Sequence, residues 1–246
     1  MKKPCTLSLL ALSLAIAGPA AADDAWDGIY VGLNAGHANG SADTRFDPLP
    51  SPTAFVNLRP TTLTPDPSGS VYGAQLGYNW QTKHFLIGFE ADIGWANADG
   101  AARSTPIVQN NGTPFPGAGY ISATADMRSF STMRLRLGYA NDAWAFYATG
   151  GFADANIKNT AVTDFRPTGT TTYTGVKDNS QTGTVFGLGA EWKATERFSF
   201  KLEAMRYRLG TETLVADAAP ALPPFQMRYT WENKGNLIRL GVNYHF

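Results

Sequence analysis

Three histidines are the residues of this sequence best suited to acid–base chemistry: His37, His84 and His245. Acyl transfer needs such a base beside a nucleophile, with a carboxylate that orients it. His37 has no serine or acid at a recognisable spacing, His84 lies in a short predicted turn, and His245 is next to the C-terminus. We therefore expect these side chains to pack or to lie at an interface, and we predict no catalytic site and no enzymatic activity.

Metal and cofactor chemistry has no recognisable site in the sequence either. Cys5 is the only cysteine, and it lies in an N-terminal segment that we expect to be removed, so the mature chain would have no thiol. Asp43, Asp47 and Asp66 could bind a cation, but their irregular spacing favours solvated loop acids. We predict neither a metal nor a cofactor.

A larger set of charged residues is balanced in sign and regular in position. Its members alternate with apolar residues, so each lies on the opposite face of an extended segment from its apolar neighbours. Because a buried charge without a partner is costly, equal numbers of acids and bases predict one connected ion-pair network in the interior. The predicted network comprises Glu90, Asp92, Arg134, Arg136, Glu191, Lys201, Glu203 and Arg239.

Eight extended segments would position these charges, because apolar side chains recur at every second residue in eight places. In one segment, for example, Phe85 and Ile87 share a face, while Gly88 and Glu90 share the other. An even number of antiparallel strands can close into a barrel. The segments span residues 29–36, 72–80, 85–95, 132–139, 144–152, 185–192, 198–205 and 238–246.

The connections between these segments alternate in length. Three are short, at residues 81–84, 141–142 and 194–197. Four are long and rich in Pro, Gly, Thr, Asn and Asp, at residues 38–69, 97–122, 154–179 and 210–233. Short turns at one rim and long loops at the other are typical of outer-membrane barrels, with both termini at the short-turn, periplasmic side.

The apolar faces carry more large aromatic side chains than the interior of an eight-stranded barrel can hold, whereas the opposite faces are rich in glycine. We therefore predict an all-β fold, an eight-stranded antiparallel transmembrane up-and-down β-barrel with short periplasmic turns and long extracellular loops. Its apolar face meets lipid, and its narrow lumen is plugged by the ion pairs. An aromatic girdle at the periplasmic lipid boundary is predicted from Trp26, Tyr78, Trp80, Phe85, Tyr139, Trp144, Trp192 and Phe198.

Residues 1–22 are predicted to be a cleaved signal peptide, with Lys2 and Lys3 followed by an apolar run and small residues. The barrel domain would then span residues 23–246. Without the two lysines, the 20 basic residues fall to 18, against 20 acidic ones, and neither sign forms a long run. We expect no nucleic-acid partner, because tracking phosphates needs clustered bases.

Several short motifs resemble those of a known group of proteins. Together with the export signal, their order and spacing are similar to the small outer-membrane barrels known as porin-family or immunogenic outer-membrane proteins, relatives of the OmpA transmembrane domain and the opacity antigens. The resemblance covers the whole mature chain and implies the outer membrane of a Gram-negative bacterium, reached through the periplasm. The motifs lie at residues 26–32, 147–153, 202–207 and 241–246.

The resemblance also implies a role for the end of the chain. In this family, a terminal phenylalanine preceded by alternating apolar residues resembles the signal that the outer-membrane insertion machinery reads. The same residues could simply form the last lipid-facing strand, and both roles can hold together. The matching residues are Ile238, Leu240, Val242, Tyr244 and Phe246.

Sequence and resemblance together predict a structural barrel surrounded by outer-membrane lipid and lipopolysaccharide, whose loops take part in antigen or adhesion-type contacts with a host or surface ligand. The resemblance leaves two alternatives: a narrow pore for passive diffusion of small solutes, as the porin label implies, and a barrel enzyme that modifies lipid A. The narrow interior and the missing catalytic constellation favour the structural role.

Overall fold

The computed structural model describes residues 25–50, 58–104, 108–109, 113, 119–166 and 171–246. The predicted signal peptide, residues 1–22, lies outside these described residues. Within them, no helix is long and apolar enough to span a membrane.

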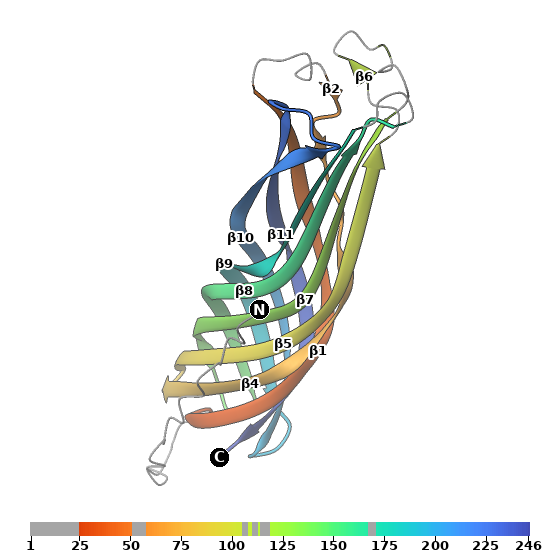
Figure 1. The fold of residues 1–246 in the computed structure, drawn as a ribbon. Coiled ribbons are helices and arrows are strands. Elements are labelled where there is room, and N and C mark those ends of the chain that lie inside the picture. The colour runs from red at the N-terminus through yellow and green to blue at the C-terminus, as the bar shows by residue number, and fades with distance from the viewer. Residues whose placement is uncertain (1–24, 51–57, 105–107, 110–112, 114–118, 167–170) are drawn as a thin grey trace, which may run out of the picture.

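Eight long strands build the molecule, and each pairs antiparallel with its neighbours. The last strand also pairs with the first along a register that runs from Tyr30↔His245 to Leu49↔Gln226, which closes the sheet into a barrel (Figure 1). The predicted eight-stranded antiparallel barrel is confirmed. The strands are β1 (Gly28–Leu49), β4 (Ser68–Thr82), β5 (Phe85–Ser104), β7 (Tyr120–Ala140), β8 (Trp144–Asp164), β9 (Thr172–Lys193), β10 (Phe198–Ala219) and β11 (Gln226–His245).

Three two-residue strands lie at the end of the barrel opposite the C-terminus (Figure 1). β3 (Thr62–Leu63) pairs with β1 at Thr44 and Arg45. β2 (Leu58–Arg59) pairs with β6 (Val108–Gln109), which ties the first long connection to the second.

The alternation of short and long connections is confirmed, but the predicted loop boundaries are wrong. β1 continues to Leu49 and β8 to Asp164, so much of each predicted loop is strand. Seven of the eight long strands have 20 to 22 residues, about twice the 9–11 that a tilted strand needs to span a bilayer. The barrel therefore continues well beyond the membrane.

The half of the barrel near the C-terminus, here called the membrane half, has its apolar side chains outside. On β5 the outward positions from Phe85 to Trp95 cover ten residue steps, about 34 Å along the strand, which a tilt of about 40° reduces to about 26 Å of height. Leu135 and Leu188 expose 60% and 68% of their surface, which lipid would cover. The predicted outward direction of the apolar face is confirmed.

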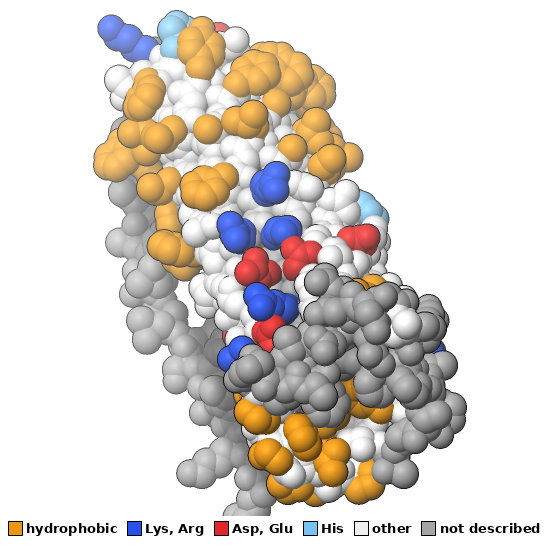
Figure 2. Space-filling model, turned by 90° about the horizontal axis from the view of Figure 1, so that it is seen from above, with side chains coloured by type: hydrophobic (Ala, Val, Ile, Leu, Met, Phe, Trp, Pro, Cys, Tyr) orange, Lys and Arg blue, Asp and Glu red, His pale blue; other side chains and the backbone are white. Residues whose placement is uncertain are grey.

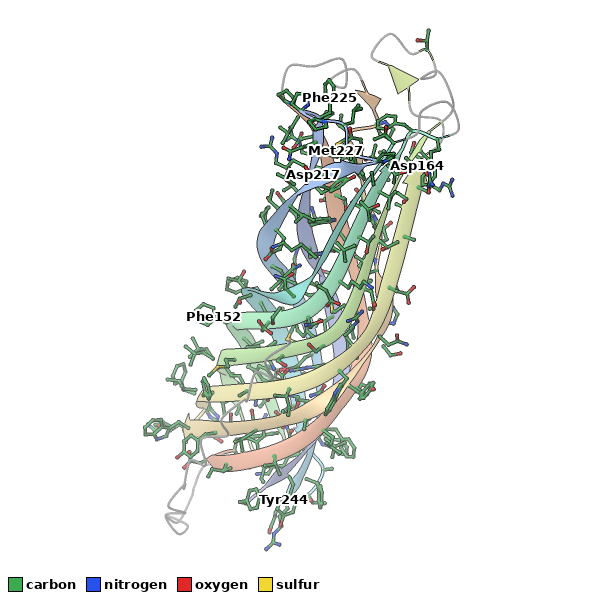
Figure 3. The ribbon with its side chains drawn as sticks, in the orientation of Figure 1. Phe152, Asp164, Asp217, Phe225, Met227 and Tyr244 are labelled. Carbon is green, nitrogen blue, oxygen red and sulfur yellow. The ribbon has the colours of Figure 1, made fainter. Side chains whose placement is uncertain are left out.

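The half near the long connections, here called the outer half, has the opposite arrangement. Its outward positions carry mostly polar residues such as Thr124, Asp178 and Arg228, while its interior is apolar. Figure 3 shows Asp164, Asp217, Phe225 and Met227 at this end, far from Tyr244. The interior is filled by Phe46, Ile121, Ala123, Ala161, Phe165, Tyr173, Ala216, Ala218, Met227, Tyr229 and Trp231.

Candidate functional site

The lumen of the membrane half holds the charged residues that the sequence singles out, and the structure brings all eight of them together. They project from β5, β7, β9, β10 and β11, and each is no more than 5% exposed. Strand register accounts for much of this convergence, because inward acids and bases stand directly opposite one another across neighbouring strands. The paired positions are Glu90↔Arg134, Lys201↔Glu191 and Glu203↔Arg239.

Glu90 is the centre of this cluster, which we call the lumen network. Its Oε2 lies 2.7 Å from Lys201 Nζ and 3.6 Å from Arg136 Nη1, and its Oε1 lies 3.4 Å from Arg239 Nη2. Arg134 donates a hydrogen bond to the same Oε1. One buried carboxylate thus contacts all four bases, so its charge is shared by the whole cluster.

The other two acids at this level link the same bases to one another. Glu203 Oε2 lies 2.8 Å from Arg239 Nε and 3.3 Å from Lys201 Nζ, and its Oε1 lies 3.1 Å from Arg134 Nη1. Asp92 Oδ2 lies 3.0 Å from Arg239 Nη2 and 3.2 Å from Arg134 Nη2. Because each acid bridges at least two bases, the pairs form one connected network rather than separate salt bridges.

Two buried tyrosines extend the network. The Tyr30 hydroxyl donates to Glu90 Oε2 at 2.7 Å and accepts from Arg136 Nη1 at 2.5 Å. The Tyr147 hydroxyl donates to Glu203 Oε1 at 3.0 Å, and its ring lies 3.8 Å from the Arg136 guanidinium. These contacts satisfy hydrogen-bonding groups that burial would otherwise leave without partners.

The tyrosines were missed at the sequence level, although cross-strand glycines mark their positions. Tyr30 lies opposite Gly77, and Tyr147 lies opposite Gly189. A Cβ at Gly77 would lie 2.2 Å from the Tyr30 ring, and one at Gly189 would lie 2.3 Å from the Tyr147 ring. Inward glycines therefore make room for rings that fill the lumen.

Glu191 carries the network toward the periplasmic end. Its Oε2 lies 2.7 Å from Arg136 Nη2, and its Oε1 accepts hydrogen bonds of 2.5 Å from both Ser199 and Asn243. His245 Nε2 lies 2.9 Å from Ser199 Oγ and 3.7 Å from Glu191 Oε1. His245 is therefore part of the packed interior.

Trp26 corrects the predicted aromatic girdle, because it lies inside the barrel rather than at its lipid surface. It is fully buried, its Nε1 donates to the carbonyl of Asn141 at 2.7 Å, and its ring meets His245 edge-on at 5.7 Å. The residue precedes β1, so the alternation of that strand does not set its direction. Trp26 caps the lumen together with Leu86, Ala140 and Ala145.

Apolar side chains fill the lumen on the other side of the network. They are contributed by all eight long strands, and none is more than 6% exposed. The network is therefore enclosed between an aromatic cap and an apolar layer. That layer comprises Ala38, Val71, Ala98, Met127, Phe130, Ala153, Ala155, Ile157, Val185, Met205, Tyr207, Leu209 and Leu237.

The other predicted girdle residues point outward near the short turns: Tyr78, Trp80, Phe85, Tyr139, Trp144, Trp192 and Phe198. A second aromatic belt at the far edge of the membrane half was missed, because its members lie far from any short turn. It contains Tyr72, Trp95, Phe152 and Phe186, and the first two stack at 5.9 Å. Figure 3 shows Phe152 projecting from the outside of the wall.

The proposed insertion-signal residues all lie on the lipid-facing side of the closing seam. Ile238, Leu240 and Val242 are 41% to 65% exposed on β11, and Phe246 is 78% exposed. The Phe246 amide donates to the Ile29 carbonyl at 3.1 Å, which joins the chain end to β1.

His37 has a neighbour that its sequence spacing does not reveal. Ser68 Oγ lies 3.0 Å from His37 Nε2, because β1 and β4 pair in this register. Asp99 stands opposite Ser68 on β5, so the serine lies between the imidazole and the carboxylate. A catalytic triad needs the histidine in the middle, and the arrangement therefore does not match one.

Two of the three acids considered for cation binding, Asp43 and Asp47, are paired with bases in the outer half, while Asp66 is exposed. Asp43 Oδ2 lies 2.6 Å from Lys234 Nζ, and this hydrogen bond lowers the pKa of Asp43. Asp47 Oδ1 lies 2.8 Å from Arg45 Nε. Among the described residues, no group of three or more His, Cys, Asp or Glu is arranged to hold a metal.

Comparison with known sequences gives a match along almost the whole chain. A family model described as the outer membrane protein beta-barrel domain matches residues 8–246. The 31 kDa outer-membrane immunogenic protein of Brucella melitensis biotype 1 is 28% identical over 230 residues, which cover 90% of this chain and 84% of that protein. The protein of the same name from Brucella suis biovar 1 matches to the same extent.

Solved outer-membrane barrels resemble the chain at low sequence identity. The outer membrane protease OmpT from Escherichia coli is 11% identical with a TM-score of 0.48, and the match covers 92% of this chain and 99% of that one. OprG from Pseudomonas aeruginosa is 9% identical with a TM-score of 0.44, over 89% and 97% of the two chains. On the strength of the family match, this chain belongs to the outer-membrane β-barrel family and resides in the bacterial outer membrane.

Proposed function

We propose that the protein is a structural component of the outer membrane that acts through its outer surface, with a lumen closed to solutes. The observation that carries this proposal is the enclosure of the lumen network. A solute crossing the barrel would have to separate bases from Glu90, and each separation leaves charges unpaired in a dry interior, which is strongly unfavourable. An eight-stranded barrel has no spare width around these side chains.

Electrical recording tests the closed lumen. The purified protein, reconstituted in a planar lipid bilayer, is expected to give no large, steady conductance steps, while a sixteen-stranded porin recorded in parallel conducts. Liposome swelling with small sugars should give the same contrast. Reproducible steady conductance from most insertions of the natural protein would refute the closed lumen and favour the narrow-pore alternative.

We propose that the outer half and its loops form the surface through which the protein makes its contacts outside the cell. The Brucella relatives are named as immunogenic proteins, and we propose the same kind of exposure for the loops of this chain. The connection between β10 and β11 suits a test, because Leu222 at its tip is 44% exposed. A short epitope inserted after Leu222 should be labelled by antibody on intact cells, whereas one inserted in the turn after Asp142 should be labelled only after the outer membrane is opened.

We also propose that the end of β11 is read by the insertion machinery. Deleting Phe246 should lower the amount of folded, heat-modifiable barrel in the outer membrane. Phe198→Ala is the matched control, because Phe198 is an outward aromatic at the same rim but not at the chain end. Equal losses in both variants would reduce Phe246 to an ordinary lipid-facing residue.

The proposed role is not enzymatic. In the described part of the chain, no hydrogen bond or ion pair joins His37 to a carboxylate, and the charged residues of the lumen network are enclosed away from any substrate. Mass spectrometry of lipid A from cells with and without the protein should give the same species. A mass change that His37→Ala abolishes would overturn this part of the proposal.

A further inference from the structure

Three outward bases stand together just beyond the lipid-facing surface on β10 and β11. Arg206 is the next outward residue after Ala204, and Arg208 follows it. Arg208 pairs directly with Lys234 on β11. Two like charges opposite each other on one face of a sheet are unfavourable without a counter-charge. We call Arg206, Arg208 and Lys234 the cationic patch.

The acids near this patch neutralise it only in part. Glu232 Oε2 lies 3.6 Å from Arg208 Nη2, and Asp43 Oδ2 lies 2.6 Å from Lys234 Nζ. Both acids lie on the side of the patch away from the lipid-facing surface. Glu232 is two residues nearer to the long connection than Lys234 on β11, and Asp43 pairs with Glu232 from β1. Among the described residues, Arg206 has no ion pair. The side that faces the bilayer therefore remains positive.

The six long strands outside the patch carry no base at their first outward polar position. Figure 2 shows basic side chains along the edge of the hydrophobic surface on the visible face. On the remaining long strands, the first outward polar residue beyond the apolar ones is uncharged, acidic or a histidine. These residues are His37, Ser70, Asn97, Ser131, Asp154 and Thr184. Among the eight long strands, the first outward polar residue is therefore basic only on β10, at Arg206, which lies near Arg208 and Lys234.

An apolar groove lies below the patch on the same strands. It has a volume of about 410 Å³ and is lined mainly by Leu33, Ala35, Phe200, Leu240 and Val242, from β1, β10 and β11. The short side chain of Ala35, directly opposite Leu240, helps to leave it open. Lys234 of the patch and Leu240 of the groove are six residue steps apart on β11, about 20 Å along the strand, which is within reach of a long acyl chain.

We propose that this side of the barrel is a binding site for lipid A, the phosphorylated glycolipid of the outer leaflet. Its phosphate groups lie at the cationic patch, where arginine can donate paired hydrogen bonds to phosphate, and one of its acyl chains lies in the groove. The patch is at the extracellular edge of the membrane half, which is where the outer leaflet places its phosphates. The inference rests on the membrane orientation and does not depend on whether the lumen is closed.

The test compares two variants that lose the same charge. Arg206, Arg208 and Lys234 are changed to serine in one, and Arg45, Arg128 and Arg228, outward bases farther from the lipid surface, are changed to serine in the other. Binding of bisphosphorylated lipid A to the refolded protein in detergent is measured by native mass spectrometry. We expect at least tenfold weaker binding for the first variant and less than a twofold change for the second. Heat-modifiable migration checks that each variant folds.

Two further measurements separate specific binding from general attraction. Arg206→Lys combined with Arg208→Lys keeps the charge and should retain most of the binding, while dephosphorylated lipid A should bind the natural protein as weakly as the serine variant binds the intact lipid. Equal losses in both serine variants, or equal binding of the two lipids to the natural protein, would overturn the phosphate site.

The acyl half of the site has its own control. Ala35→Phe fills the groove and should weaken binding of lipid A severalfold, whereas Ala148→Phe adds the same bulk to the lipid-facing wall on β8, away from the groove. If both substitutions leave binding unchanged, or both weaken it equally, the groove is not the acyl site.

Discussion

The membrane half and the outer half of the barrel place opposite kinds of side chain on their outer and inner faces. In the membrane half, Leu135 faces outward and Arg134 inward, while in the outer half Thr124 faces outward and Ala123 inward. The backbone alternation is the same, so the difference lies in what surrounds the wall. Lipid favours apolar side chains on the outer face, whereas water favours polar ones. The interior is therefore polar where lipid surrounds the wall and apolar where water does. A single strand can therefore change its pattern where it leaves the membrane.

On two strands, β7 and β10, the change of pattern coincides with irregular pairing. The β7–β8 register shifts between Met127 and Ser129, and the β10–β11 register shifts between Arg208 and Thr211. β-Bulges of this kind send the following side chains to the other face. On β7, inward positions are even-numbered in the membrane half and odd-numbered beyond the shift, as Thr132 and Ala125 illustrate.

The largest difference in stability between substitutions in the two halves should come from Glu90→Ala in the membrane half. This change leaves four buried bases without their common partner, and breaking a buried ion pair by removing one member costs about 3–5 kcal/mol. Unfolding by urea in detergent micelles, followed by tryptophan fluorescence, measures the loss.

Glu232→Ala is the control in the outer half, because the Glu232 pair with Arg208 is exposed and worth about 1 kcal/mol at most. If the two substitutions destabilise the barrel equally, the lumen network contributes no more than a surface pair.

The next largest contrast comes from placing one charge on each outer wall. Leu135→Arg puts a guanidinium near the middle of the lipid-facing surface and should destabilise the barrel in bilayers by about 2–4 kcal/mol. Thr124→Arg, on the same strand in the outer half, should change stability by less than about 0.5 kcal/mol, because that wall faces water. Similar losses at both positions, measured by unfolding in liposomes, would contradict the assigned membrane boundary.

The smallest expected effect concerns Asp164, at the tip of β8 in the outer half. Arg166 donates hydrogen bonds to Asp164 from its side chain and its backbone, and these lower the pKa of Asp164 to about 2. Because the folded pKa lies below the usual value of about 3.9, the contact stabilises the fold above that pH and is lost as the pH falls toward 2.

Titration of the Asp164 carboxyl by NMR should show this shift, and Arg166→Ala should return the midpoint to near 3.9. Arg166 is largely exposed, so the effect on stability should stay below about 1 kcal/mol. A midpoint near 4 in the natural protein would show that the contact does not persist in solution.

The sequence predicts the membrane half well because lipid imposes a strong pattern there. Large side chains such as Phe85 and Leu137 alternate with glycine or charge, and that contrast is visible without a structure. The members of the lumen network could also be named from this alternation. Which acid contacts which base could not, because Glu90 meets Lys201 and Arg239 across the lumen rather than along a strand pair.

The strands of the outer half could not be predicted from the sequence, for a physical reason. Its inward side chains are often small, such as Ala123 and Ala161, and its outward ones are Thr, Asn and Asp, which also favour turns. A strand with this composition resembles a loop in the sequence. Contacts set by register between distant segments, such as Ser68 beside His37, are likewise invisible to spacing rules.

Because the strands are long, the connecting tips lie far from the part of the wall that must fit lipid and assemble in the membrane. The outer half raises its connecting tips above the bilayer by about ten residues of strand, about 34 Å along the strand. Substitutions at the tips, such as those around Leu222, need not meet the demands of lipid or of assembly. The tips can therefore change in sequence while the wall below them stays fixed.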